Sequence, residues 1–83
     1  MDNRQLQIFQ CVASQLSFTQ AAKALHMAQP AVSIAIKKLE SELNSQLFDR
    51  AEKKISLTPE GQVLLEHANR ILDQPIPQPL PRY

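Results

Sequence analysis

Three polar residues recur at helical spacing in the stretch AQPAVSIAIKKLE, residues 28 to 40. Gln29, Ser33 and Lys37 are each four residues apart, so a helix would place them on one face, one turn after another. A glutamine amide can hydrogen-bond adenine in the major groove of DNA, a serine hydroxyl can bond a phosphate, and a lysine neutralises the phosphate backbone. The spacing therefore predicts a surface that binds a nucleic acid.

The opposite face of this helix is apolar. At 100° per residue, one side collects Val32, Ala35, Ile36, Leu39 and Leu43. Pro30 and Ile34 fall on the free side, and Ile34 lies roughly 150° from the centre of the apolar stripe. Because an isoleucine cannot hydrogen-bond, we interpret Ile34 as an apolar contact with a thymine methyl group. The alternative, that it packs on a neighbouring helix or is simply exposed, stays open.

A short helix and a tight turn must position this surface. Residues 3–16 repeat apolar side chains at three- and four-residue steps, which predicts an amphipathic helix that buries Leu6, Phe9, Val12, Ala13 and Leu16. Ser17 or Thr19 can cap a second helix, whose apolar positions are Ala21, Ala22 and Leu25. Pro30 is tolerated only in the first turn of the third helix, which reaches about Leu43. This order predicts a helix-turn-helix, whose second helix enters the major groove when the motif binds DNA.

A small hairpin follows the third helix. Leu47 and Phe48 precede a charged stretch, and Ile55 and Leu57 alternate with a serine. This pattern favours two very short strands joined by the basic segment RAEKK, residues 50–54. The lysines and the arginine of that segment are expected to neutralise phosphates.

The segment TPEG opens a fourth helix. Thr58 is suited to the cap, Pro59 to the first helical position and Glu60 to the positive end of the helix dipole. The apolar stripe of this helix consists of Leu64, Leu65, Ala68, Ile71 and Leu72. Residues 74–83 carry four prolines at alternate positions, which predicts an extended or disordered tail.

The composition limits the class of protein. With 83 residues and a formal net charge of +1, the chain is one small domain or a fragment of a larger chain. Domains of this size are marginally stable, and the usual additional support is a disulfide, a metal or a partner subunit. Cys11 is the only cysteine, which excludes an internal disulfide and favours a reducing compartment; we interpret it as a core residue. The two histidines lie far apart, so no metal or cofactor is expected. A partner subunit is therefore the remaining candidate for the additional stability.

Several function classes lack their sequence signatures. The polar N-terminus argues against a signal peptide, and no apolar run is long enough to span a bilayer. No Ser-His-acid grouping, glycine-rich phosphate loop or paired carboxylates can be assembled, so we do not expect an enzyme. No acidic residue occurs between Asn3 and Leu39, whereas seven follow from Glu40 onward. This asymmetry suggests a face for an anionic partner, or a chance distribution of surface charge.

The stretches FTQAAKALHMAQPAVSIAIKKLESEL and QLFDRAEKKISLTPEG resemble the N-terminal winged helix-turn-helix domain of LysR-type transcriptional regulators. The residues in the family's register are Ala21, Ala22, Leu25, Gln29, Pro30, Ser33, Leu39, Glu40, Leu47, Phe48, Arg50, Leu57, Thr58 and Gly61. The resemblance implies a mainly α fold with a three-helix core and a two-stranded wing in residues 1–58. A linker helix would follow in 59–73, and the tail would occupy 74–83.

The resemblance implies a bacterial regulator that acts in the cytoplasm, at the nucleoid, on double-stranded DNA. Residues 29 to 37 would enter the major groove, and the wing would lie at the flanking minor groove. The residues expected to contact DNA are Thr19, Gln29, Pro30, Ser33, Ile34, Lys37, Lys38, Arg50, Lys53, Lys54 and Thr58. The homodimer interface would be the linker-helix stripe of Leu64, Leu65, Ala68, Ile71 and Leu72, so that the dimer binds an interrupted inverted repeat. A small effector would bind only a C-terminal domain that is absent from this chain.

Three positions depart from the family pattern. The family usually has Ser or Thr at the position of Ala28, where the hydroxyl caps the recognition helix. It often has Arg at the positions of Ile34 and Lys53. The first change removes a cap, the second removes a charge, and the third keeps the charge but loses the planar guanidinium.

Other readings stay open at this point. The same fold can serve as a protein–protein interaction module, although such a groove would carry large apolar anchors where this helix carries polar residues. The stripe of the last helix could belong to the core of one chain, and His26 could be structural or face solvent.

Overall fold

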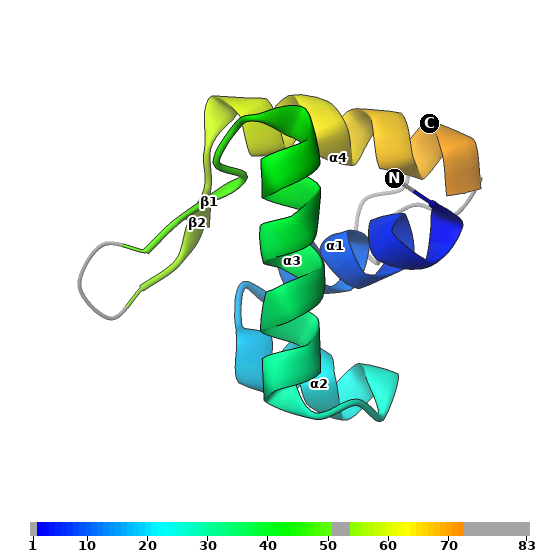
Figure 1. Cartoon of the computed structure of the whole chain (residues 1–83), viewed down its shortest axis with the longest axis vertical. Coiled ribbons are helices and arrows are strands. Elements are labelled where there is room, and N and C mark those ends of the chain that lie inside the picture. Colours follow the sequence, from blue (N-terminus) through cyan, green and yellow to red (C-terminus); the bar gives the residue numbers. More distant parts are fainter. Residues whose placement is uncertain (1, 51–53, 73–83) are drawn as a thin grey trace, which may run out of the picture.

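A computed structural model describes residues 2–50 and 54–72 of the chain. The described residues form α1 (Asn3–Gln15), α2 (Phe18–Leu25), α3 (Gln29–Leu43), β1 (Phe48–Asp49), β2 (Ser56–Leu57) and α4 (Pro59–Leu72). α2 lies at one end of α3 and α4 lies across the other end, while the β1–β2 hairpin projects to the side (Figure 1). The predicted mainly α winged helix-turn-helix is confirmed, whereas Lys53 and the segment 74–83 lie outside the described residues.

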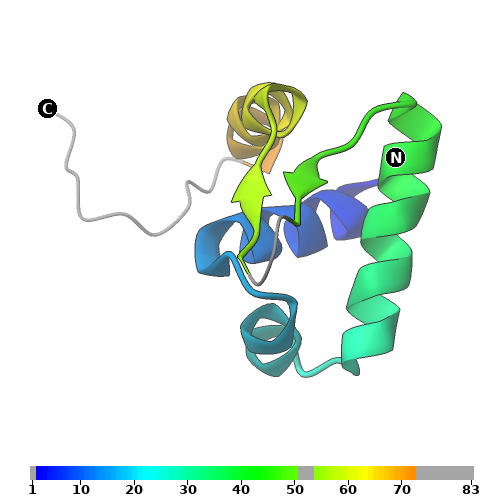
Figure 2. The same cartoon turned by 90° about the vertical axis from the view of Figure 1, so that its left-hand side faces the viewer.

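The core forms where α1, α3 and the hairpin converge. Its largest fully buried side chains are Phe9, Val12, Val32, Ile36, Leu39, Leu47 and Phe48. Phe48 of β1 packs against Phe9 and Phe18, with ring centroids 5.4 Å and 5.9 Å away. Tilted and edge-on aromatic pairs of this kind stabilise by about 0.5–1.5 kcal/mol beyond the area they bury. The hairpin is therefore held to the core by its first strand. The two strands lie side by side, with β1 on the side of α3 (Figure 2).

The first two helices end in left-handed residues that are not glycine. α1 ends at Gln15, and Leu16 adopts φ 50° at the C-cap with its side chain about half exposed. The prediction that Leu16 belongs to the buried stripe was therefore wrong, because the helix stops one residue before it. Ser17, and not Thr19, caps α2 by accepting from the N–H of Gln20 at 3.1 Å.

The turn between α2 and α3 is closed by backbone hydrogen bonds. His26 adopts φ 56°, its N–H bonds the carbonyl of Lys23, and the N–H of Met27 bonds the carbonyl of Ala22. This pair of bonds is a Schellman motif, which satisfies the last carbonyls of a helix and reverses the chain. His26 is exposed and serves this turn, in agreement with its expected structural or solvent-facing role.

The connection from α3 to the wing depends on Glu40. Its carboxylate accepts from the N–H of Leu47 at 2.8 Å, and the carbonyl of Leu47 accepts from the N–H of Thr58 at 3.1 Å. The strands pair antiparallel, Phe48 with Leu57 and Asp49 with Ser56. Leu43 was expected in the core, but it remains 37% exposed because α3 extends past the packed region at its end.

α4 packs along α1 and is anchored at both ends of the contact. A Cβ added at Gly61 would collide with the carbonyl oxygen of Leu47, so only glycine permits this approach of helix to loop. Further along, the buried amide of Gln10 donates to the Oδ1 atom of Asn69 at 2.6 Å. These contacts fix the direction of α4 relative to the helix-turn-helix.

Candidate nucleic-acid interface

The N-terminal half of α3 presents the predicted face to solvent. Gln29, Pro30 and Lys37 are exposed, and Ser33 is half buried. Ile34 is 66% exposed, the highest value among the large apolar side chains that are both described and exposed. The apolar side of α3 is turned inward, with Val32, Ile36 and Leu39 fully buried. The helical wheel therefore located both faces correctly.

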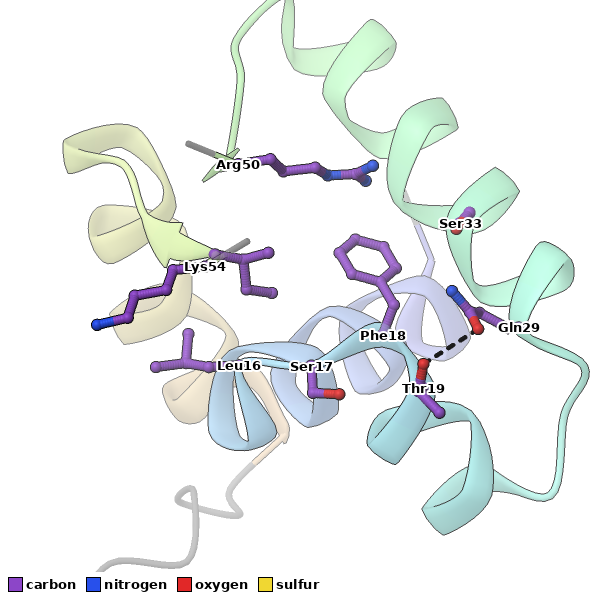
Figure 3. A pocket seen from close by; sticks show the side chains of 9 residues that line it. Leu16, Ser17, Phe18, Thr19, Gln29, Ser33, Arg50 and Lys54 are labelled. Atoms are coloured by element: carbon purple, nitrogen blue, oxygen red, sulfur yellow. Dashed lines mark hydrogen bonds between the residues drawn. The ribbon is translucent and has the colours of Figure 1, made fainter. Parts of the chain in front are cut away.

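One hydrogen bond joins α2 to this face. The Thr19 hydroxyl donates to Oε1 of Gln29 at 3.1 Å, and the close-up in Figure 3 shows the amide nitrogen turned away from Thr19. Both residues are exposed, so the bond lies at the surface that a groove-binding helix would present. It holds the oxygen end of the glutamine amide toward α2.

The wing and α2 enclose a polar hollow beside α3. Its volume is about 470 Å³ and its lining includes Thr19, Gln29, Ser33, Arg50 and Lys54. The guanidinium carbon of Arg50 lies 4.4 Å from the centroid of the Phe18 ring, a cation–π contact that holds the side chain over α2. The lining therefore combines one amide and three hydroxyls with the side chains of Arg50 and Lys54. In Figure 3 the Arg50 guanidinium extends toward α3, whereas the Lys54 ammonium points away from it.

The predicted DNA contacts outside this hollow divide into three cases. Lys38 is exposed on α3, and Lys53 lies outside the described residues. The hydroxyl of Thr58 donates to the carbonyl of Gln46 at 2.6 Å and accepts from the N–H of Gly61 at 2.9 Å. Its only hydrogen is thus used inside the protein, at the start of α4.

The stripe on α4 is shared between the core and the surface. Leu64 and Ala68, which the sequence assigned to a dimer interface, are buried within the single chain, and Leu65 and Leu72 are half buried against the same core. Ile71 remains 50% exposed, as does Val63 at 65%. The side chains available to a partner are therefore at the edge of the predicted stripe, because α1 already covers its centre.

Redox and metal chemistry in the described part of the chain would depend on its cysteine, histidine and carboxylate side chains. Burial raises the pKa of the Cys11 thiol, and its Sγ lies 3.9 Å from the carbonyl oxygen of Ala21, to which it donates. Among the described residues, no cluster of histidine, cysteine and carboxylate side chains could hold a metal ion. No helix within residues 2–50 and 54–72 is long and apolar enough to cross a membrane.

Sequence patterns missed the residues that support the site. The Phe18 ring contacts the guanidinium of Arg50, and Gln10 of α1 donates a hydrogen bond to Asn69 of α4. Each pair is separated by more than thirty positions along the chain, so no local periodicity links its members. A polar residue inside the apolar stripe of α1 was the one available signal for Gln10.

The arrangement of three helices, a two-stranded wing and an exposed polar recognition face defines a winged helix-turn-helix domain. A family model described as "Bacterial regulatory helix-turn-helix protein, lysR family" matches residues 3–62. The chain belongs to this family.

Known proteins of the family match most of the chain. It is 50% identical over 72 residues to the transcriptional regulator CzcR of Bacillus subtilis, which covers 87% of this chain and 25% of the relative. It is 51% identical over 71 residues to the regulator CfxR of Cupriavidus necator, covering 86% of this chain and 22% of the relative. The crystal structure of the BenM DNA-binding domain with catB site 1 DNA superposes with a TM-score of 0.84 at 40% identity, covering 88% and 81% of the two chains. The chain spans about a quarter of the length of these curated relatives.

Proposed function

We propose that this chain is the sequence-specific DNA-binding domain of a bacterial transcriptional regulator. The observation that carries the proposal is the exposed strip of Gln29, Pro30, Ile34 and Lys37 at the start of α3, bordered by Arg50 and Lys54. A helix enters the major groove with such a strip, whose amide and apolar groups meet base edges while cations meet phosphates. The similarity to a domain solved on DNA supports the same use here.

Each part of the surface has a distinct task in this proposal. Gln29 lies nearest a base edge, Ile34 meets a thymine methyl, and Ser33 and Lys37 approach phosphates. The wing brings Arg50 and Lys54 to the backbone of the flanking minor groove. The protein would act in the cytoplasm at the nucleoid, and a small effector would be bound by a domain outside these 83 residues.

A homodimer through α4 completes the proposal. Val63 and Ile71 lie two turns apart on α4 and are exposed, while Leu43 at the end of α3 borders the same apolar groove as Val63. Two copies joined by this edge would present two recognition helices to one side of the duplex. The operator is then an interrupted inverted repeat.

A protein–protein interaction module is less well supported. A groove for a partner protein needs several large apolar anchors, whereas the outer face of α3 offers only Ile34 among polar and small residues. The exposed apolar side chains of α4, Val63 and Ile71, together with Leu43 of α3, are assigned to the second copy of the chain in this proposal.

Salt-dependent binding tests the proposal directly. Fluorescence anisotropy with duplexes selected from a random pool should show log K falling by about 0.9 per phosphate contact for each unit of log[salt]. Lys37→Ala and Lys54→Ala should each flatten that slope by about one, whereas Arg70→Ala, at the far end of α4, should leave it unchanged. Absence of binding to any duplex, or binding independent of salt, would refute the proposal.

Sedimentation tests the dimer separately. Ile71→Asp places a charge on the exposed edge and should give a folded monomer that binds a half-site weakly, because a buried unpaired carboxylate is costly. Gln62→Asp introduces the same charge elsewhere on α4 and should leave the dimer intact. A dimer that persists in the Ile71 variant contradicts the interface, although not the DNA-binding surface.

A further inference from the structure

We propose that Thr19 sets the base specificity of Gln29 by holding its amide in one orientation. This inference rests on the proposed DNA-binding function and concerns which base the glutamine selects. From sequence alone, Gln29 is expected to pair with adenine, for which the amide must use its oxygen and its nitrogen side by side. The structure places the two ends of the amide in different situations.

The oxygen end of the amide faces α2. The Thr19 hydroxyl donates to Oε1 of Gln29 at 3.1 Å, and Figure 3 shows Oε1 directed at Thr19 with Nε2 on the other side of the group. No described residue accepts a hydrogen bond from Nε2. Since a primary amide nitrogen carries two hydrogens, Gln29 presents two donors and turns its acceptor toward the protein.

A side chain whose acceptor is held toward the protein, and whose donors are left for a base, discriminates among the four bases. In the major groove guanine exposes two acceptors, N7 and O6, and thymine exposes the acceptor O4. Adenine places a donor, N6–H, beside its acceptor N7, and cytosine exposes only a donor. With Oε1 held by Thr19, Gln29 therefore favours guanine or thymine over adenine, and cytosine is the least favoured.

The geometry makes Thr19 a positioning residue. Its single hydroxyl hydrogen is used on Gln29, so it cannot donate to a phosphate at the same time. Thr19 is exposed at the second position of α2, after the Ser17 cap, and its side chain is not part of the core. Its hydroxyl can therefore be removed without unfolding the domain.

The experiment uses the whole chain and duplexes selected by it from a random pool. Comparison with Gln29→Ala identifies the base pair whose preference depends on Gln29, and four duplexes differing at that pair are then titrated. Thr19→Val keeps the shape of the side chain but removes the hydrogen bond to Oε1. The affinity for the adenine duplex, relative to the guanine and thymine duplexes, should then rise by on the order of tenfold. Thr19→Ser keeps the hydroxyl and should retain the wild-type order of bases.

Each result decides between this inference and its alternatives. A wild-type preference for adenine at the Gln29 position, or an equal loss of affinity for all four duplexes in Thr19→Val, would overturn it, since the threonine would then act as a support for adenine pairing or as a backbone contact. If Gln29→Ala changes no base preference while the chain still binds, this inference fails and the proposed function stands. If the wild-type chain binds no duplex, the proposed function itself fails.

Discussion

The starts of α3 and α4 have similar sequences and opposite surroundings. Each has a proline in the first turn, Pro30 and Pro59. Thr58 caps α4 with its hydroxyl and also bonds the carbonyl of Gln46. Ala28 precedes α3 and provides no side-chain hydrogen bond to the described part of that helix. One helix start is tied to the body of the domain, and the other is open.

In the proposed function, the start of α4 supports the domain and the start of α3 contacts DNA. The start of α4 connects the wing to the helix that is proposed to join two copies. Its Thr58 and Gly61 contact the loop before β1 closely. The start of α3 leaves Gln29 and Pro30 exposed, as the proposed contact with DNA requires. It has no side-chain cap. Pro30 has no N–H, and the N–H of Ala31 bonds the backbone carbonyl of Ala28 at 3.0 Å, a bond that a hydroxyl at position 28 could supplement.

The strongest test of this comparison is Gly61→Ala. The added methyl group would meet the Leu47 carbonyl, which is backbone and cannot move aside cheaply, so we expect a loss of about 2–3 kcal/mol in the free energy of unfolding. Urea denaturation measures it. Gln62→Ala, at the exposed neighbouring position, should change stability by no more than about 0.5 kcal/mol. An unchanged midpoint for Gly61→Ala would show that α4 does not press on this loop.

Thr58→Ala should have the next largest effect. It removes the cap of α4 and a hydrogen bond to the loop before β1, and we expect a cost of about 1–2 kcal/mol. Thr58→Ser retains both bonds and should recover most of the stability in thermal unfolding. Because the hydroxyl is used within the protein, the affinity of the folded variant for DNA should not change. A loss of affinity for DNA without a loss of stability would indicate that Thr58 does contact DNA.

Ile34→Ala tests whether the exposed face at the start of α3 contacts DNA. The side chain is 66% exposed, so stability should change by no more than about 0.5 kcal/mol. Affinity for the selected duplex should fall by about 1 kcal/mol if Ile34 contacts a thymine methyl. Replacing that thymine by uracil should reproduce the loss in the wild type and add nothing in the variant. A uracil scan that finds no methyl dependent on Ile34 would exclude sequence reading by this residue.

Ala28→Ser should give the smallest effect, and unlike the other substitutions it should increase the free energy of unfolding. Ala28 has extended backbone angles, φ −71° and ψ 143°, which suit a capping serine. The change should therefore raise the free energy of unfolding by about 0.5–1 kcal/mol. Ala24→Ser on the exposed side of α2 offers no capping geometry and should not stabilise. Equal effects in both variants would mean that the start of α3 is already satisfied.

Local patterns predicted the elements well. Three- and four-residue apolar steps located the helices, the prolines marked the starts of α3 and α4, and the alternation around Leu57 located a strand. The errors came at helix ends. Leu16 and Leu43 continue the apolar periodicity of their helices, yet both are exposed because the helix stops or runs past its packing partner.

The sequence by itself determined which faces are polar and which apolar, because side chains that share a helix face are set by spacing along a few neighbouring residues. Only the tertiary structure decided which apolar positions are covered and which polar groups meet. α1 buries Leu64 and Ala68 and leaves Ile71 outside, Phe18 receives Arg50, and Thr19 bonds Gln29 across the turn. These contacts join residues on different elements, and their geometry depends on how the helices pack in three dimensions.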